Sequence, residues 1–166
     1  MDPRFYMFDL EGIFLWGFVA TLLLSTILEL SQGLGLSRMS LPFMLGTMLT
    51  ANRHRAQMVG YLLHFTLGLP VTFFYALIFE SLHLATWWLG AFMGLLQGLI
   101  TLVIPLPLLP HFHPRMASEY DGPSPTRMLE PPGFLCLNYG RRTPLTTLFA
   151  YLVFGLIMGA FYQVGR

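Results

Sequence analysis

The stretch LATWWLGAFMGLLQGLITLVIPLPLLP, residues 84–110, decides the fold class of this chain. It contains no charged side chain and is almost entirely apolar up to residue 108. Because a helix needs about 20 such residues to cross the hydrocarbon core of a bilayer, a transmembrane helix is predicted over 84–108. Pro105, Pro107 and Pro110 remove backbone donors, and we expect them to end this helix.

The rest of the chain has the same apolar character. Of its 166 residues, 55% are hydrophobic and only 10% are charged, whereas soluble domains carry about 25% charged residues. Three further segments are long and apolar enough to cross a bilayer, namely 12–36, 57–79 and 144–162. The first follows Asp9 and Glu11 rather than a basic region, so we expect a retained span and not a signal peptide. The prediction is one domain over 1–166, an all-α integral membrane protein built as a four-transmembrane-helix bundle.

A short helix is predicted between the first two spans. Apolar residues between Leu41 and Met48 repeat with helical spacing, and Ser40 is placed to cap them. Twelve residues are too few to cross a bilayer, so the segment 40–51 is predicted to be an interfacial amphipathic helix. The alternative is an N-terminal extension of the 57–79 span.

The connection 109–142 is the longest polar part of the chain and is rich in proline. We expect irregular structure that packs on one end of the bundle or on a partner. At its end, Thr143 is expected to cap the last span and Pro144 to be the first helical residue.

The distribution of arginine predicts the orientation in the membrane. All nine cationic side chains are arginines, and seven lie between the first and second or the third and fourth spans, leaving Arg4 and Arg166 near the termini. Arginine is in excess on the cytoplasmic side of membrane proteins, so both termini are predicted to lie outside. Aromatic residues typical of a membrane interface fall at the predicted outer ends of the spans: Trp16, Trp87, Trp88 and Tyr162.

Small residues form a stripe on each predicted span. Gly90, Gly94 and Gly98 repeat every four residues in the third span, and Gly155 and Gly159 do so in the fourth. Such stripes let helix backbones approach closely in a membrane. Two uses stay open: packing of the four helices within the chain, or docking of a partner subunit.

Three polar side chains inside the predicted spans form a candidate intramembrane polar cluster: Glu29, His64 and Gln97. Glu29 and His64 are predicted to lie roughly 6–8 Å to the cytoplasmic side of the midplane, at 1.5 Å per helical residue, which would allow them to meet. Such a contact is interpreted as a structural hydrogen bond, as a proton or ion relay, or as the setting of a haem or metal ligand at His64.

His111 and His113 form an H-x-H pair of the kind that binds transition metals when further ligands are present. Cys136, Glu119 and Asp121 lie in the same connection. The alternative is an interfacial turn rich in aromatic residues. No cofactor is predicted, and haem or metal at these histidines or at His64 stays an alternative.

Four arginines lie where anionic lipid head groups are found: Arg53, Arg55, Arg141 and Arg142. They are predicted to contact lipid phosphate or the acidic surface of a partner subunit. A formal net charge of +1 gives no general attraction to nucleic acid, so none is expected as a partner.

Three features resemble small four-span bacterial membrane proteins of the domain-of-unknown-function type. They are Leu63-His64-x-x-x-Gly68, the glycine-rich third span with its proline-rich exit ending in His113-Pro114, and Gly155-x-x-x-Gly159. The resemblance covers 60–162 and implies a helix bundle in the bacterial inner membrane. The predicted helix 40–51 and the segment 119–132 are not part of it.

The sequence contains no glycine-rich phosphate loop, no H-E-x-x-H and no G-x-S-x-G. We therefore predict a non-catalytic accessory or assembly subunit that packs against a larger membrane complex, such as a respiratory or photosynthetic one, with the lipid bilayer and membrane subunits as partners. One alternative is a proton or ion pathway or small transporter that uses Glu29 and His64. Another is a haem- or metal-binding electron-transfer subunit.

Overall fold

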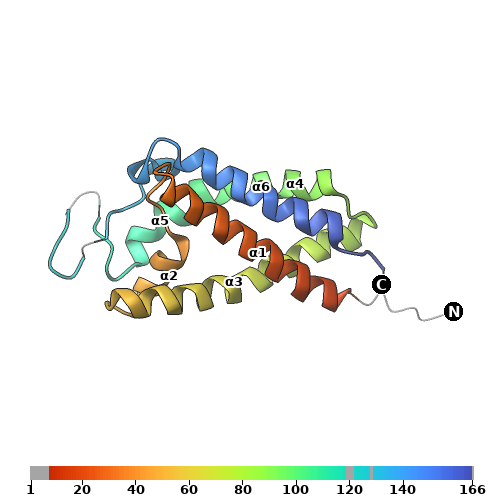
Figure 1. Ribbon diagram of the computed structural model, residues 1–166, viewed down its shortest axis with the longest axis horizontal. Helices are drawn as coiled ribbons and strands as arrows, with labels where there is room; N and C mark the ends of the chain where they lie inside the picture. The colour runs from red at the N-terminus through yellow and green to blue at the C-terminus, as the bar shows by residue number, and fades with distance from the viewer. Residues whose placement is uncertain (1–7, 119–121, 128, 166) are drawn as a thin grey trace.

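A computed structural model describes residues 8–118, 122–127 and 129–165, and these contain helices and no strands (Figure 1). Four helical segments are long and apolar enough to cross a membrane: α1 (Leu10–Gly33), α3 (Arg53–Leu82), α4 (Trp87–Val103) continued by α5 (Pro105–Phe112), and α6 (Thr143–Phe161). The predicted all-helical fold with four membrane-length helices is confirmed.

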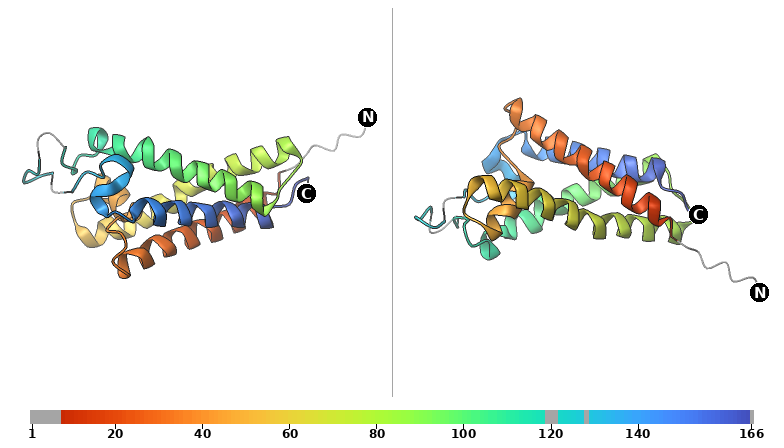
Figure 2. Two further views of the ribbon diagram at one scale, coloured as in Figure 1. Left: turned by 90° about the horizontal axis from the view of Figure 1, so that it is seen from above. Right: turned by 60° about the horizontal axis from the view of Figure 1, so that its bottom comes forward.

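The four long helices form an open arc in the order α3, α1, α6, α4. Helix α1 packs against α3 on one side and α6 on the other, and α6 in turn packs against α4. Figure 2 shows α4 and α6 running side by side, with α1 beyond α6. Although α3 and α4 are consecutive in the chain, their backbones make little contact. The arc is therefore open between them.

The start of α1 and the end of α6 lie at one end of the bundle, and both long connections lie at the other (Figure 1). At the terminal end, Glu80 near the end of α3 accepts hydrogen bonds from the Tyr162 hydroxyl at 2.8 Å and from the Gly165 N–H at 3.2 Å. This carboxylate joins the last turn of α3 to the end of α6.

Glycine determines how closely α4 and α6 approach. A Cβ added to Gly90 would clash with the Gly155 carbonyl oxygen and lie 2.8 Å from the Gly159 Cα, and one added to Gly94 would clash with the Tyr151 carbonyl oxygen. On α6, a Cβ on Gly155 would clash with the Gly90 carbonyl oxygen in return. The two backbones are thus in direct contact, which any side chain larger than hydrogen would prevent.

The short helix α2 (Leu41–Leu49) begins where the sequence predicts, because the Ser40 hydroxyl accepts a hydrogen bond from the Phe43 N–H at 3.3 Å. It does not extend α3; the chain is extended at Thr50 and turns back. A Cβ on Gly46 would clash with the Ala56 carbonyl oxygen, and one on Gly60 with that of Pro42. Helix α2 therefore packs antiparallel on the first half of α3.

The prolines after the third span do not end the helical structure as expected. Helix α4 ends at Val103, the chain breaks its helical path at Ile104 (φ −112°, ψ −77°), and α5 begins at Pro105 and continues to Phe112. Pro105 is tolerated because the first turn of a helix needs no backbone donor there. The result is a break followed by a second short helix.

The expected cap of α6 is also wrong in detail. The N-cap position is Arg142, which makes no side-chain capping hydrogen bond, and Thr143 is the first helical residue. The Thr143 hydroxyl instead hydrogen-bonds the Ser37 hydroxyl at 2.8 Å. It therefore joins the start of α6 to the chain that leaves α1.

The connection 109–142 is mostly irregular, as expected, but it contains the last four residues of α5 and a short 3₁₀ helix, η1 (Phe134–Tyr139). It is attached to the chain between α1 and α2 through Arg38. The Arg38 guanidinium forms an ion pair with Glu130 at 3.0 Å, and the Arg38 N–H donates to the Tyr139 carbonyl oxygen at 2.8 Å. The two long connections thus form one layer at this end of the bundle.

The close contact of α4 and α6 predicts that Gly155→Ala lowers the stability of the protein. The added methyl group has no space against the Gly90 carbonyl oxygen, and such overpacking costs about 1–3 kcal/mol. Thermal unfolding of the purified protein in detergent, followed by circular dichroism, measures the loss. Gly33→Ala is the matched control, because nothing lies within 4 Å of a Cβ there. Equal melting temperatures for both variants would contradict the assignment.

Candidate functional site

Gln97 of α4 is hydrogen-bonded to a residue that the sequence did not single out. The Tyr75 hydroxyl of α3 donates to the Gln97 Oε1 at 2.7 Å. Tyr75 lies seven residues before the end of α3 and Gln97 ten residues after the start of α4, so the two helices bring them to similar depths. This similar distance from the turn between α3 and α4 is the signal in the sequence that would have found Tyr75.

The Tyr75–Gln97 hydrogen bond lies in a cleft between α3 and α4. The cleft has a volume of about 330 Å³ and is otherwise lined mainly by apolar side chains, among them Phe74, Met93 and Leu96. It occupies the open side of the arc. The cleft is therefore an apolar recess on the outer surface of the bundle with one amide on its wall.

Only one of the two polar ends of the Gln97 amide is hydrogen-bonded within the described residues. The hydrogen bond from Tyr75 satisfies one end of the Gln97 side chain, and no residue in the described part of the chain bonds the Nε2 amide group at the other end. Turning the amide over exchanges the roles of its two ends and still leaves one without a partner. Inside a membrane, where water is absent, an unpaired amide group is costly. The cleft therefore contains an amide group that lacks a hydrogen-bond partner.

His64 is not part of this cleft. Its Nε2 atom is buried and has no hydrogen-bond partner in the described segments of the chain, and its ring meets the edge of Phe65 at a centroid distance of 6.4 Å. Along α3 it lies eleven residues before Tyr75, or about 16 Å. The structure therefore separates His64 from Gln97.

Glu29 and His64 do not form the predicted contact. Thr72 of α3 faces Gly17 of α1, and Gly68 faces Thr21; this antiparallel register places His64 opposite Ser25, a full turn away from Glu29. The Glu29 side chain is exposed and makes no hydrogen bond or ion pair with the described residues. The three polar residues predicted as one cluster thus occupy three places, because helix register and not depth alone decides which side chains meet.

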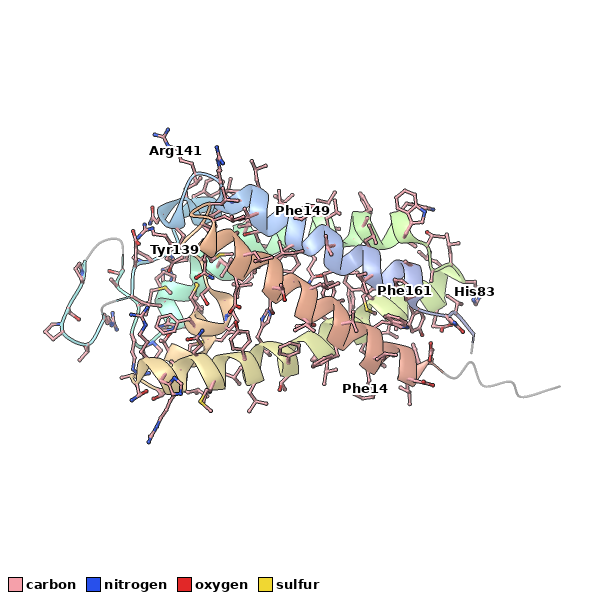
Figure 3. All side chains as sticks on the ribbon, viewed as in Figure 1. Phe14, His83, Tyr139, Arg141, Phe149 and Phe161 are labelled. Atoms are coloured by element: carbon pink, nitrogen blue, oxygen red, sulfur yellow. The ribbon has the colours of Figure 1, made fainter. Side chains whose placement is uncertain are left out.

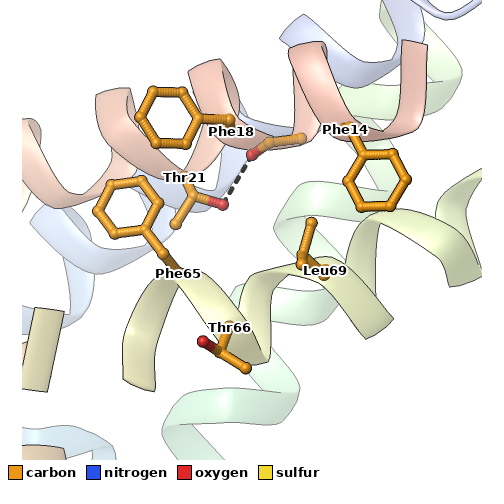
Figure 4. A pocket seen from close by; sticks show the side chains of 7 residues that line it. Phe14, Phe18, Thr21, Phe65, Thr66 and Leu69 are labelled. Carbon is orange, nitrogen blue, oxygen red and sulfur yellow. Dashed lines mark hydrogen bonds between the residues drawn. The ribbon is translucent and has the colours of Figure 1, made fainter. Parts of the chain in front are cut away.

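A second recess lies between α1 and α3 and differs in its chemistry (Figure 4). Phe14, Phe18 and Phe65 line it, and its volume is about 250 Å³. The Thr21 hydroxyl on its wall donates to the Gly17 carbonyl oxygen of its own helix at 2.8 Å. Since this hydroxyl already donates its hydrogen bond, it needs no polar group of a ligand as an acceptor.

His113 fastens the end of α5 to α2. Its Nε2 lies 3.0 Å from the Met44 carbonyl oxygen and 3.2 Å from the Thr47 hydroxyl, and its Nδ1 accepts the Arg115 N–H at 3.1 Å. The Arg115 guanidinium donates to the Thr47 carbonyl oxygen at 2.7 Å and thereby covers the end of α2. Both ring nitrogens of His113 are occupied, so this residue is a structural tie and offers no lone pair to a metal.

The other metal-ligand candidates are not assembled around it. His111 is exposed and its Nδ1 lies 3.3 Å from the Leu108 carbonyl oxygen. Cys136 is buried, and Glu119 and Asp121 lie outside the described residues. In the described part of the chain no three His, Cys, Asp or Glu side chains are grouped as metal ligands.

The four predicted lipid- or partner-contacting arginines are all exposed: Arg53, Arg55, Arg141 and Arg142. Arg53 lies over the Phe43 ring at 5.9 Å, and none of the four pairs with a carboxylate of the described residues. They lie at the end of the bundle that carries the long connections, as Figure 3 shows for Arg141, opposite His83 and Phe161.

The glycines predicted for helix packing meet within the chain, as described for α4 and α6. Gly98 completes the series, since a Cβ there would lie 3.0 Å from that of Tyr151. No protein-family model, curated protein or solved structure matches this chain. Its function must therefore be argued from its own geometry.

The tie made by His113 predicts a pH-dependent stability. Burial first, and the nearby Arg115 charge in addition, lower the pKa of His113 below its ordinary value, which is about 6.5. The neutral ring is favoured in the folded state, so the stabilisation is complete above about pH 6.5 and is lost as the pH falls toward the lowered pKa. Thermal unfolding in detergent should show this loss in the wild type and less of it in His113→Gln. The same pH profile for both proteins would exclude the effect.

The burial of Cys136 predicts an unreactive thiol. The side chain is 0% exposed, and burial raises its pKa to about 12, so almost no thiolate forms at neutral pH. A maleimide should label Cys136 only after the protein is denatured. Rapid labelling of the folded protein would show that η1 opens or is packed differently.

Proposed function

We propose that this protein is a membrane subunit without catalytic activity that receives a transmembrane helix of a larger complex in the cleft between α3 and α4. The observation that carries the proposal is the unpaired amide group of Gln97. A helix that offers a side-chain or backbone oxygen to this amide would complete the hydrogen bonding that the chain leaves unfinished.

The depth of Gln97 favours a protein partner over lipid. Ten residues from the start of α4 correspond to about 15 Å, which is near the middle of a hydrocarbon core of about 30 Å. Acyl chains at that depth have no hydrogen-bond acceptor, and lipid ester groups lie nearer the surface. A polar group carried into the membrane by another helix is the chemistry that fits.

The exposed surface of α3 and α4 also supports docking of a partner helix between them. The share of residues buried within the bundle, taken over the most apolar part of each helix, is 22% in α3 and 22% in α4–α5. The same share is 39% in α1 and 39% in α6. The helices at the two ends of the arc thus leave more apolar surface free than the two in its middle. A helix inserted between α3 and α4 would close the arc.

Location and orientation belong to the same proposal. The arginine-rich end, with seven of the nine arginines, is assigned to the cytoplasm, and both termini to the outside of a bacterial inner membrane. This placement agrees with the resemblance to small four-span bacterial proteins. The larger complex is proposed to be a respiratory or photosynthetic one. No specific observation favours a proton pathway, because Glu29 and His64 lie apart.

The cleft predicts a site-specific crosslink to a partner protein in native membranes. A photoreactive phenylalanine analogue replaces Phe74, which lines the cleft and is 58% exposed. We expect an adduct with one protein of defined mass, identified by mass spectrometry. The additional change Gln97→Leu should weaken the adduct several-fold, because the apolar side chain cannot pair with the polar group of the partner.

The matched control carries the same analogue at Phe14 of α1, which is 57% exposed and lies away from the cleft. It should give no adduct with the same protein. Adducts of equal yield at both positions, adducts with lipid alone at Phe74, or a yield unaffected by Gln97→Leu would each contradict the proposal.

A further inference from the structure

A groove separate from the α3–α4 cleft runs between the last turns of α1 and the first turns of α6. Ile27, Leu30 and Leu34 line it on the α1 side, and Leu145 and Phe149 on the α6 side. Its volume is about 550 Å³, within the range of about 300–1,000 Å³ typical of ligand sites. The seven helical steps from Arg142 to Phe149 give the groove a length of about 10 Å along α6.

The groove has one free polar group, at one end. The Ser31 hydroxyl donates to the Leu28 carbonyl oxygen at 2.6 Å, and the Thr146 hydroxyl donates to the Thr143 carbonyl oxygen at 3.0 Å. Arg142 also lines the groove, is exposed, and has no hydrogen bond or ion pair from its guanidinium to any described residue. The groove therefore fits a molecule that is apolar along its length and negatively charged at the Arg142 end.

We propose that this groove binds one anionic phospholipid. Its phosphate is held by the guanidinium of Arg142, and the upper part of one acyl chain lies between α1 and α6. Arginine presents a planar set of N–H donors that matches two phosphate oxygens. The adjacent Arg141 projects from the bundle at the start of α6, with Phe149 further along the helix (Figure 3), and adds positive charge at the head-group position.

Charge favours an anionic head group over a zwitterionic one. Both arginines lack a carboxylate partner in the described segments, and no acidic side chain lines the groove. The ammonium of a zwitterionic head group would be repelled by this pair, whereas phosphatidylglycerol carries only the phosphate charge. The groove also lies at the end of the bundle where head groups of the arginine-rich leaflet are expected.

Native mass spectrometry of the purified full-length protein tests the site. The protein is released from nanodiscs made of equal parts of dioleoyl phosphatidylglycerol and dioleoyl phosphatidylcholine. We expect the wild type to retain one phosphatidylglycerol in preference to phosphatidylcholine. Arg142→Gln should reduce this retention by about tenfold, the effect of losing one charge-assisted hydrogen bond. Arg127→Gln is the matched control, since it removes the same charge from another exposed position that does not line the groove, and it should change retention little.

A second variant separates the groove from simple charge attraction. Leu145 is 69% exposed, so Leu145→Trp should fold while its larger ring fills the groove and leaves both arginines in place. We expect this variant to lose the lipid as Arg142→Gln does. Equal losses in Arg142→Gln and Arg127→Gln, full retention in Leu145→Trp, or no preference of the wild type for phosphatidylglycerol would each overturn the proposal. Because the purified chain contains no partner, these results are independent of the α3–α4 cleft.

Discussion

The direct backbone contact between α4 and α6 is the interaction on which the rest of the bundle depends. In a lipid environment no hydrophobic force drives helices together, because acyl chains are as apolar as leucine. Glycines on both helices allow carbonyl oxygens and Cα atoms to touch, with Gly90 and Gly155 facing one another. Helix α6 lies against α4, α1 packs on the other side of α6, and α3 lies at the far end of the arc.

The open side and the groove follow from this one-sided arrangement. A closed ring of four helices would have covered Gln97 between α3 and α4, but the arc leaves its amide at the wall of an apolar cleft. On the opposite flank, the groove between α1 and α6 ends at Arg142. The two faces thus offer different chemistry: an uncharged amide midway along α4, and a cation at the end of the bundle that carries the long connections.

Much of the architecture could be predicted from the sequence, because it depends on local rules. Apolar length predicts four membrane helices, Ser40 predicts the start of α2, and the spacing of Gly90, Gly94 and Gly98 marks the face of α4 that approaches α6. The wrong predictions concern helix ends, which depend on contacts between segments far apart in the sequence. Pro105 starts a second helix because Ile104 absorbs the break, and Thr143 bonds Ser37 because another segment lies within reach.

The candidate site was harder to predict for the same reason. Depth along a helix can be counted from sequence, but the direction of a side chain around the helix depends on the register with a neighbour. Thr21 against Gly68 sets that register for α1 and α3 and turns Glu29 away from His64. Gln97 stands out in the sequence as a polar residue within an apolar span, whereas its partner Tyr75 does not, because tyrosine is common in ordinary packing.

The order of the helices along the chain has a consequence for biosynthesis. The glycine face of α4 is made before its partner, since α6 begins only at Thr143 and residues 104–142 must be synthesised in between. During that interval the surface of α4 that packs on α6 is uncovered, whereas α1, α2 and α3 can already pack against one another. The nascent chain therefore exposes one smooth helix face until α6, which is translated later, packs against it.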